Sequence, residues 1–519
     1  MRYEVEFLEN EYFWGGATNF GTDMPVSAES VYNRDFTVDP RNQMMPLYIS
    51  SKGRYIWSED TFRVWIENRK LCFEGSGFEL KKVGETLRQA YLGAMRDHFP
   101  FTGKSVPKEF FTTAQYNTWM EYTYHPTQEK VLDYAHNIID HGFEPGILII
   151  DEGWHGRYGM WEWDRAAFPD PAAMTAELHA LGFKIMLWVT PNVCPDGQDF
   201  ILRAFPRFGH KDSGELFLRN KQGEVAIVKW WNGYSAILDL RKECDREFLD
   251  GRLKILTEEY GIDGFKFDGG SFDMYHPSSI INGEARPDHD PAEMNIAWNR
   301  FGERYRFHEY KDTFKGGGRA TVQRLCDRGH LWEGDGINTL IPCSILQGLM
   351  GHPFICPDMI GGGEWSFTVK PGFKIDEELF IRMAQASALC PMMQFSWAPW
   401  RALSEKSYRI VAEAGRLHKE MSDIILKYVS LAESTGEPVL RCLEYNFPGC
   451  GYEKITDQFM IGDEVLVCPV VTKGTTEKDV VLPAGNWRSL GADKDRIYAG
   501  GQTLRMSTPL SKLLYFTKA

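Results

Sequence analysis

Apolar runs of strand length, each followed by a polar residue, recur through the middle of this chain with helical segments between them. The clearest three are residues 146–150 before Asp151, 183–189 before Thr190 and 264–267 before Asp268. Such short runs bounded by turn residues are typical of strands buried on both faces. Strands that alternate with helices predict a parallel sheet. Because each strand ends in a polar residue, we expect these side chains to collect at one face.

This alternation predicts an α/β fold with a (β/α)8 TIM barrel over residues 108–429. Such a barrel takes about 250 residues, more with insertions, and keeps its active site at the carboxyl ends of its strands. Apolar residues at helical spacing predict helices at 127–141, 172–181, 245–260, 341–350, 377–389 and 404–429. The last is expected to be one long helix that completes the barrel.

Strand-like segments without helices between them lie on both sides of the barrel. The chain has 519 residues, and single cores stop growing beyond roughly 250–300 residues. We therefore predict a small N-terminal β-sandwich-like domain over residues 1–107 and a C-terminal β-sandwich over 430–519. Their expected strands are 3–7, 46–50, 62–67, 71–73, 439–445, 458–461, 464–471, 479–482 and 512–516.

Charge and cysteine usage exclude some partners and compartments. The formal net charge is −14, without a cluster of Lys and Arg to neutralise phosphates, so nucleic acid is not an expected partner. The ten Cys residues lack paired metal-ligand spacing and indicate buried free thiols in a reducing compartment. The first residues lack the apolar core of a signal peptide, and no stretch reaches the roughly 20 apolar residues of a membrane span. We expect a cytoplasmic protein without membrane contact, although a trimmed secreted form would look the same.

Two Asp residues are the leading catalytic candidates. Asp268 ends a predicted strand, and Asp335 follows Gly334, which lets the chain turn and present a carboxylate. Such a pair could serve as nucleophile and general acid/base in glycosidic bond cleavage, where the leaving oxygen must be protonated while the cationic sugar carbon is trapped. Metal-assisted hydrolysis is the main alternative, because Asp at strand ends also binds metals. No His/Asp cluster accompanies the pair, so neither a metal nor a cofactor is predicted.

Several ordered motifs resemble those of glycoside hydrolase family 31, the retaining α-glycosidases. The nucleophile motif of the family resembles residues 264–268 (Gly-Phe-Lys-Phe-Asp), and its acid/base motif resembles residues 332–335 (Trp-Glu-Gly-Asp). Two further signatures are similar to residues 163–171 (Trp-Asp-Arg-Ala-Ala-Phe-Pro-Asp-Pro) and 358–362 (Asp-Met-Ile-Gly-Gly). The sandwich that follows the family's barrel is similar to residues 458–470 and 482–487.

The resemblance implies a role for each candidate site residue. Asp268 would attack the anomeric carbon, and Asp335 would protonate the leaving oxygen and later deprotonate water, with the two carboxyl groups about 5–5.5 Å apart. Lys266 would keep Asp268 ionised, and Arg319 would hold the sugar and the charge near the nucleophile. The other residues expected to bind the sugar or line its subsite are Asp151, Glu152, Trp154, Trp188, Trp332, Asp358, Gln394 and Ser396.

The expected substrate follows from positions where the chain differs from the family pattern. Many α-glucosidases of the family have a P-x-x-R-x-H motif where residues 391–396 read Pro-Met-Met-Gln-Phe-Ser, without the His that binds a glucose hydroxyl. Residues 151–154 (Asp-Glu-Gly-Trp) are also similar to the D-[DE]-G-W motif of α-galactosidases. The resemblance therefore implies an exo-acting α-galactosidase of an α-galactosidase-like branch.

Other functions on the same scaffold remain open at this stage. An α-glucosidase or α-xylosidase would share the whole mechanism, and an α-glucan lyase would share the carboxylates but eliminate instead of hydrolysing. A non-catalytic sugar-binding protein is disfavoured by the presence of both Asp268 and Asp335. The expected partner is a small α-glycoside or oligosaccharide, and family relatives often form homo-oligomers.

Overall fold

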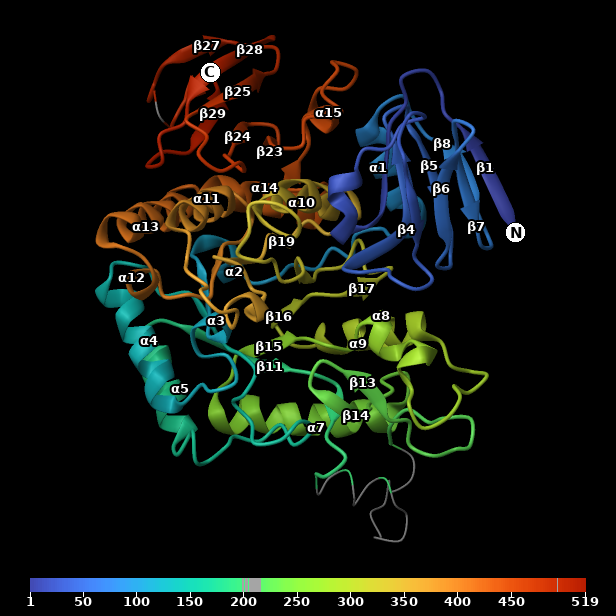
Figure 1. Cartoon of the computed structure of the whole chain (residues 1–519), viewed down its shortest axis with the longest axis vertical. Coiled ribbons are helices and arrows are strands. Elements are labelled where there is room, and N and C mark those ends of the chain that lie inside the picture. Colours follow the sequence, from blue (N-terminus) through green and yellow to red (C-terminus); the bar gives the residue numbers. More distant parts are fainter. Residues whose placement is uncertain (198–199, 201–203, 205–215, 492) are drawn as a thin grey trace.

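The parallel strands predicted from the sequence form one curled sheet at the centre of the molecule (Figure 1). The structure is a computed structural model that describes residues 1–197, 200, 204, 216–491 and 493–519. All pairings within this sheet are parallel. Its spatial order is β19 (Ile355–Cys356), β18 (Val322–Arg324), β16 (Phe307–Tyr310), β15 (Gly264–Phe267), β11 (Lys184–Val189), β10 (Ile147–Ile150), β9 (Gln115–Asn117), β21 (Gln394–Phe395) and β20 (Met359–Ile360).

One chain segment closes this sheet into a ring. Strands β19 and β20 are separated only by Pro357 and Asp358, and β19 pairs with β18 while β20 pairs with β21. The two therefore share a single strand position, and the ring has the eight positions of the predicted barrel. Asp358, at the interruption, has a φ of 112°, a conformation that residues other than glycine rarely adopt.

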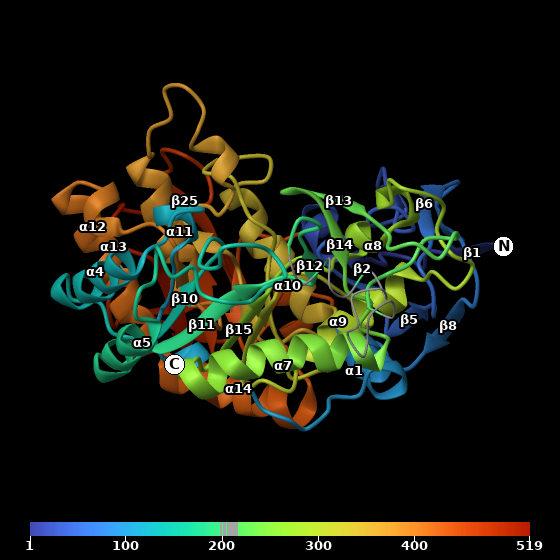
Figure 2. The same ribbon diagram turned by 90° about the horizontal axis from the view of Figure 1, so that it is seen from below.

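Helices cover the outside of the ring, and Figure 2 shows β10, β11 and β15 side by side with α5 and α7 outside them. Local signals set the helix ends. The Thr127 hydroxyl accepts a hydrogen bond from the Lys130 backbone N–H at the start of α4, and Gly261, with a φ of 68°, ends α7 just before β15. The covering helices are α4 (Gln128–Asp140), α5 (Pro171–Ala180), α7 (Glu243–Tyr260), α9 (Pro291–Gly302), α10 (Leu340–Leu349), α11 (Glu377–Ala388), α13 (Glu405–Glu420) and α14 (Ser422–Thr435).

The single helix predicted over residues 404–429 is wrong. Two helices, α13 and α14, occupy this segment and continue to Thr435. They separate at Met421, whose φ of −91° and ψ of 1° leave the helical region. The apolar spacing continues across this break, which is why the sequence pattern does not reveal it.

Two antiparallel sheets form the N-terminal region, and one of them continues into the barrel segment. The first sheet has the order β1 (Arg2–Glu6), β7 (Lys70–Glu74), β6 (Arg63–Glu67) and β3 (Asn33–Asp35). The second has the order β17 (Thr313–Phe314), β4 (Gln43–Ser50), β5 (Arg54–Trp57) and β8 (Glu79–Lys82), with β2 (Phe13–Ala17) also on β4; helix α1 (Leu87–His98) follows. Because β17 lies between β16 and β18 in the chain and pairs with β4, backbone hydrogen bonds join the two regions.

The Gln43 side chain strengthens this junction. Its Nε2 donates hydrogen bonds to the carbonyl oxygens of Lys311, at 2.9 Å, and Arg324, at 2.8 Å. Asn42 lies beside it, and its side-chain oxygen accepts a hydrogen bond of 2.6 Å from the backbone N–H of Cys326. The N-terminal sheet therefore fixes the chain where β16 and β18 end.

The C-terminal region is a pair of sheets, as predicted. One has the order β22 (Leu440–Arg441), β23 (Phe459–Ile461), β24 (Val465–Cys468), β29 (Leu514–Lys518), β26 (Asn486–Ser489) and β27 (Ile497–Ala499), and the other pairs β25 (Glu477–Leu482) with β28 (Gln502–Ser507). The strand expected over 439–445 ends early, because helix α15 (Leu443–Asn446) begins two residues later. There the Glu444 carboxylate accepts a hydrogen bond from the Gly449 backbone N–H, which stabilises the turn.

All ten Cys residues are free thiols, as expected. Six thiols are buried, whereas Cys450 is exposed. Within the described residues, no helix combines the length and the apolar character needed to cross a membrane.

Short elements fill the connections between the sheets and the covering helices. They are α2 (Glu109–Thr112), α3 (Trp119–Tyr122), β12 (Asn192–Val193), β13 (Val228–Trp230), β14 (Gly233–Ile237), α8 (Phe272–Tyr275), α12 (Pro399–Ala402) and the 3-10 turns Thr18–Asp23, Pro277–Ser279, Ile337–Thr339 and Trp365–Phe367.

Candidate active site

A cavity of about 300 Å³ opens beside Asp268, directly after β15. Its wall brings together residues from three sources. The barrel supplies Asp268, Lys311, Asp327, Arg328 and Asp335, the β13–β14 turn supplies Trp231, and the N-terminal region supplies Asn19, Arg41 and Asn42. The predicted pair Asp268 and Asp335 therefore faces one cavity at the carboxyl end of the barrel strands.

Asp268 is a buried carboxylate held from several sides. Trp188 Nε1 donates a hydrogen bond of 3.0 Å to its Oδ2, and the Gly269 backbone N–H donates one of 2.9 Å to its Oδ1. Two ammonium groups lie close by, with Lys311 Nζ 3.4 Å from Oδ1 and Lys266 Nζ 3.9 Å from Oδ2. Burial alone would raise the pKa of Asp268, but Lys311 and then Lys266 outweigh it, so the pKa is lowered. An ionised Asp268 is the form that a nucleophile requires.

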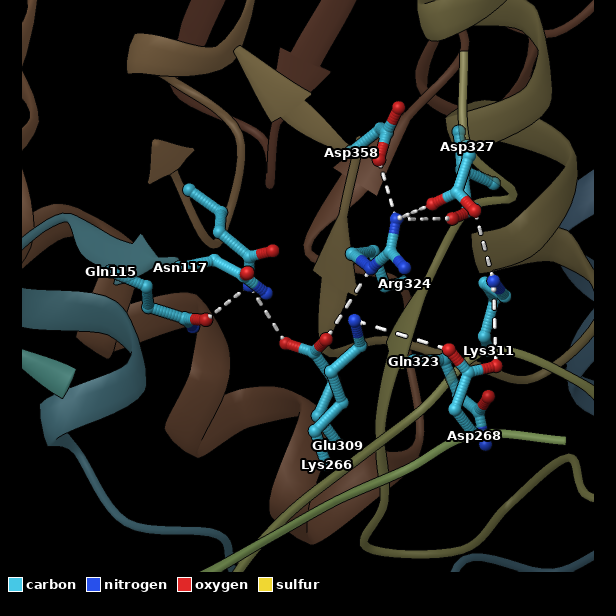
Figure 3. A network of polar contacts seen from close by, with 12 residues as sticks. Gln115, Asn117, Lys266, Asp268, Glu309, Lys311, Gln323, Arg324, Asp327 and Asp358 are labelled. Atoms are coloured by element: carbon cyan, nitrogen blue, oxygen red, sulfur yellow. Dashed lines mark hydrogen bonds and ion pairs between the residues drawn. The ribbon is translucent and has the colours of Figure 1, made fainter. Parts of the chain in front are cut away.

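Lys311 and Asp327 were not predicted from the sequence, and Figure 3 shows the Lys311 ammonium between the carboxylates of Asp268 and Asp327. Lys311 follows β16 and Asp327 lies three residues after β18. The Lys311 ammonium is 3.0 Å from Asp327 Oδ2, so a single cation bridges two carboxylates. Carboxylates paired across one cavity can divide nucleophilic and proton-transfer roles.

Asp335 reaches the same cavity from an exposed loop. Its side chain is 76% exposed, and its ion pair with Arg328 Nη1 is long, at 3.6 Å. The loop is fixed through its backbone, because the Asp335 carbonyl accepts a hydrogen bond of 2.9 Å from the Gly329 N–H. The Asp335 carboxylate therefore has far fewer fixed contacts than the Asp268 carboxylate.

Arg324, a third residue missed in the sequence, is completely buried among carboxylates (Figure 3). Its Nη1 lies 2.5 Å from Asp358 Oδ1 and 2.9 Å from Asp327 Oδ1, and its Nε lies 3.3 Å from Glu309 Oε1. Burial raises the pKa of Glu309 and of Asp358, and Arg324 opposes both rises. Asp358 also accepts a hydrogen bond of 2.7 Å from the Arg328 backbone N–H. It thus stabilises the network instead of lining the cavity.

Lys266 connects Asp268 to the predicted sugar-binding residue Asp151. The Lys266 ammonium donates a hydrogen bond of 2.6 Å to Asp151 Oδ2, and both side chains are buried. Asp151 lies behind Lys266 and is not part of the cavity wall described above. The adjacent Glu152 accepts hydrogen bonds from the Tyr158 hydroxyl, at 2.6 Å, and from Asn232.

Burial raises the pKa of Glu152 to about 8, against the hydrogen bond from Tyr158, and the charges of Asp151 and Asp268 add to the rise. The folded protein therefore holds a proton on Glu152 at pH values where an unfolded Glu, with a pKa near 4.3, has lost it. Stability from this group is complete below that unfolded value and is lost as the pH rises towards 8.

We expect the thermal unfolding midpoint of the wild type to fall more steeply between pH 5.5 and 8.5 than that of Glu152→Gln, which cannot titrate. Differential scanning calorimetry at several pH values measures this slope. Glu258→Gln, on the exposed side of α7 beside Lys254, is the matched control and should keep the wild-type slope. Equal slopes for wild type and Glu152→Gln would contradict a raised pKa of Glu152 in the folded protein.

The three predicted tryptophans have different surroundings. Trp188 donates directly to Asp268, whereas Trp154 is fully buried and donates a hydrogen bond of 2.8 Å to the Trp188 carbonyl. Trp332 is partly buried and donates a hydrogen bond of 3.1 Å to Asp376. The tryptophan that lines the cavity with an exposed ring is Trp231, at 49% exposure, and such rings suit the apolar faces of sugars.

Arg319 does not reach the site, contrary to the prediction. It precedes β18, at the amino end of the strand, and makes a bidentate ion pair with Glu303. Barrel chemistry is located at the carboxyl ends of the strands. Arg324 and Arg328, which end and follow β18, are the arginines that the fold delivers there.

Gln394 and Ser396, which lie in one of the two segments that led to the galactoside expectation, have protein partners. Gln394 Nε2 donates to Gln115 Oε1 at 2.8 Å and to Glu309 Oε2 at 2.9 Å. The Ser396 hydroxyl accepts a hydrogen bond of 2.6 Å from the Met120 backbone N–H. Both side chains are fully buried, so these contacts orient strands around the site.

Family comparison agrees with the barrel and with the separate C-terminal region. The model of the "Glycosyl hydrolases family 31 TIM-barrel domain" matches residues 105–429, and that of the "Glycosyl hydrolase family 31 C-terminal domain" matches residues 436–519. The chain belongs to glycosyl hydrolase family 31.

Individual relatives extend this comparison. The chain is 31% identical over 449 residues to the myogenesis-regulating glycosidase of Mus musculus, covering 84% of this chain and 60% of that protein. It is 24% identical over 423 residues to alpha-glucosidase 2 of Bacillus thermoamyloliquefaciens, covering 76% and 50%. The structure of the Flavobacterium johnsoniae GH31 dextranase complexed with glucose superposes with a TM-score of 0.83 at 19% identity, covering all of this chain and 66% of that one. The chain thus spans 60% or less of these two curated relatives.

Proposed function

We propose that the protein is an exo-acting α-glycoside hydrolase that works by double displacement, with Asp268 as the nucleophile. The observation that carries this proposal is the environment of Asp268, whose carboxylate is buried between two ammonium groups and the Trp188 N–H yet opens onto a cavity with further carboxylates. A volume of about 300 Å³ lies at the lower end of the 300–1,000 Å³ typical of ligand cavities. That size favours removal of a terminal sugar.

In the first step, an Asp268 oxygen forms a bond to the anomeric carbon while the bond from that carbon to the leaving oxygen breaks and the leaving oxygen takes a proton. In the second step, water attacks the same carbon, the ester bond to Asp268 breaks, and a carboxylate accepts the proton of the water. We assign both proton transfers to Asp335, which lines the same cavity as Asp268.

An α-glucoside or α-xyloside is a better-supported substrate than an α-galactoside. Relatives of the chain carry the names alpha-glucosidase, from Bacillus thermoamyloliquefaciens, and alpha-xylosidase, from Saccharolobus solfataricus. The galactoside expectation rested in part on residues 391–396, where the Gln394 amide nitrogen is engaged by Gln115 and Glu309 and the Ser396 hydroxyl by the Met120 backbone N–H. The residue-level reason for preferring galactose is therefore weakened.

Initial rates on p-nitrophenyl α-glucoside, α-xyloside and α-galactoside test this proposal. We expect the highest kcat/KM on the glucoside or the xyloside, with free hexose or pentose as the product. Release from the galactoside alone would overturn the proposed sugar and restore the earlier expectation. An unsaturated keto-sugar in place of the free sugar would identify a lyase.

Replacing Lys311 by Met is expected to move the acid limb of kcat/KM to higher pH. The wild-type Lys311 cation lowers the pKa of Asp268, so its removal raises that pKa and protonates the nucleophile at pH values where the wild type is active. The pH dependence of kcat/KM measures the shift. Lys311→Arg keeps the charge and is the control, and an acid limb unchanged in Lys311→Met would contradict the role given to this cation.

A further inference from the structure

We propose that a groove on the outside of the barrel, between α7 and α9, binds an organic phosphate. The groove is a cavity of about 340 Å³. Of the described residues in its wall, Glu293 alone carries a carboxylate. The site is separate from the cavity beside the nucleophile, since the walls of the two share no residue. Four arginines line the groove: Arg241, Arg246, Arg300 and Arg304.

Two helices bring these arginines together. Arg241 lies just before α7, and Arg246 is in the first turn of that helix. Arg300 is in the last turn of α9, and Arg304 follows the end of α9 by two residues. Asp250 of α7 connects the two sides, because Arg304 Nη1 lies 3.1 Å from its Oδ1. The walls of the groove are therefore fixed relative to each other.

Two of the four arginines have carboxylate partners. Arg241 makes a bidentate ion pair with Asp239, with Nε and Nη2 each 2.9 Å from a carboxylate oxygen. Arg304 is paired with Asp250, and its guanidinium carbon lies 4.5 Å from the centroid of the Phe301 ring. The aromatic ring supports this guanidinium group, so Arg304 is held in place without a bound ligand.

Arg246 and Arg300 have no carboxylate partner among the residues that the structure describes. Arg246 Nη1 donates hydrogen bonds of 2.8 Å and 2.6 Å to the carbonyl oxygens of Leu240 and Arg241, which orient the guanidinium but do not neutralise it. The Arg300 side chain is exposed. Glu293 lies seven positions before Arg300 on the same helix, about 10 Å away along the helix axis, and forms no ion pair with it.

The charge and geometry of this arginine pair suit a phosphate group. A guanidinium presents parallel N–H donors that match two phosphate oxygens. A phosphate monoester carries close to two negative charges at neutral pH, so one such group would neutralise both Arg246 and Arg300. A carboxylate ligand would neutralise only one of them.

The rest of the wall favours an organic body beside the oxyanion. Leu240, Ile296, Ala297 and Phe301 contribute apolar side chains, and Ile296 and Ala297 are partly exposed on α9. The volume of the groove lies within the 300–1,000 Å³ typical of small-molecule cavities, and a free phosphate ion would leave the apolar side chains uncovered. A phosphate ester therefore fits the groove better than inorganic phosphate.

The positive groove contrasts with the charge of the whole chain, which is −14. Most of the surface repels an anion, whereas the groove attracts one over the roughly 10 Å that screening allows at 0.1 M salt. We therefore expect binding to weaken as the ionic strength rises.

Titration of the whole chain with phenyl phosphate at low ionic strength, followed by the phosphorus-31 resonance, tests the proposal. We expect saturable binding by the wild type and an affinity lower by about tenfold or more in Arg246→Met and in Arg300→Met, because each variant loses one charged hydrogen-bond donor. Arg409→Met removes an exposed arginine of α13. It is the matched control and should bind phenyl phosphate as the wild type does.

Each other outcome overturns the proposal. Inorganic phosphate that binds as tightly as phenyl phosphate would remove the organic ligand, and equal binding by the wild type and both variants would place the phosphate site elsewhere. Absence of binding by the wild type would remove the site altogether. Because Arg300 is exposed and has no side-chain partner within the described chain, Arg300→Met should fold, and it carries the test if circular dichroism shows that Arg246→Met does not.

Discussion

Replacing Asp268 by Asn is expected to reduce turnover of α-glycosides by on the order of 10⁴-fold or more, because the amide cannot form the glycosyl ester. The fold should survive, since the amide keeps the side-chain volume and its oxygen can still accept one of the two hydrogen bonds that Trp188 Nε1 and the Gly269 N–H donate to separate carboxylate oxygens. Steady-state kinetics on the preferred p-nitrophenyl glycoside, with calorimetry on the same preparation, measures both effects. Lost activity with retained folding would support Asp268 as the nucleophile.

Asp263→Asn provides the matched control for this prediction. Asp263 lies just before the other end of β15, where it pairs with His179 and Lys184 on the outer side of the barrel. Its replacement should leave kcat/KM within a few fold of the wild type. Wild-type turnover in Asp268→Asn would remove the nucleophile assignment, whatever the control shows.

Replacing Arg324 by Met is expected to lower the free energy of unfolding by about 3–5 kcal/mol, the usual cost of leaving buried charges without their partner. The variant keeps the volume but leaves Glu309, Asp327 and Asp358 facing one another around an uncharged side chain. Urea unfolding of wild type and variant measures the difference. Arg409→Met, which removes an exposed pair with Glu405 on α13, should change stability by less than about 1 kcal/mol.

The loss of stability in Arg324→Met is expected to change with pH in one direction. Without Arg324, burial raises the pKa of Asp358 further above its unfolded value, so stability is retained at acid pH and is lost as the pH rises through the folded pKa. The deficit of Arg324→Met should therefore be smallest at acid pH. Adding Asp358→Asn to this variant should recover part of the stability, and a deficit that is equal at all pH values would contradict the electrostatic explanation.

Sequence patterns predicted the strands that are apolar throughout and the site residues that follow them. Strand β10 reads Ile-Leu-Ile-Ile, and Asp268 directly follows β15. The burial of these strands and the positions where they end therefore follow from residue types. The overall barrel with a β-region on each side was predictable for the same reason.

The strands that were missed are short and polar. Strand β16 reads Phe-His-Glu-Tyr and β18 reads Val-Gln-Arg, and both bury charged or amide groups inside the ring. Their stability comes from pairing across the network, as between Arg324 and Glu309, and a single sequence does not reveal pairing. Because these strands were missed, Lys311 and Asp327 at their ends were missed as well. Arg319 was expected near the nucleophile but precedes the amino end of β18.

The two hydrogen bonds from Gln43 to the carbonyl groups of Lys311 and Arg324 have a consequence for how this protein can be divided. The rim of the candidate site is assembled from two regions of the chain that lie more than 250 positions apart, since these bonds span 268 and 281 positions. A barrel expressed without the N-terminal sheets would leave the ends of β16 and β18 unsupported. For protein engineering and for chimeras between relatives, the smallest transferable unit that carries this site therefore includes the N-terminal sheets together with the barrel.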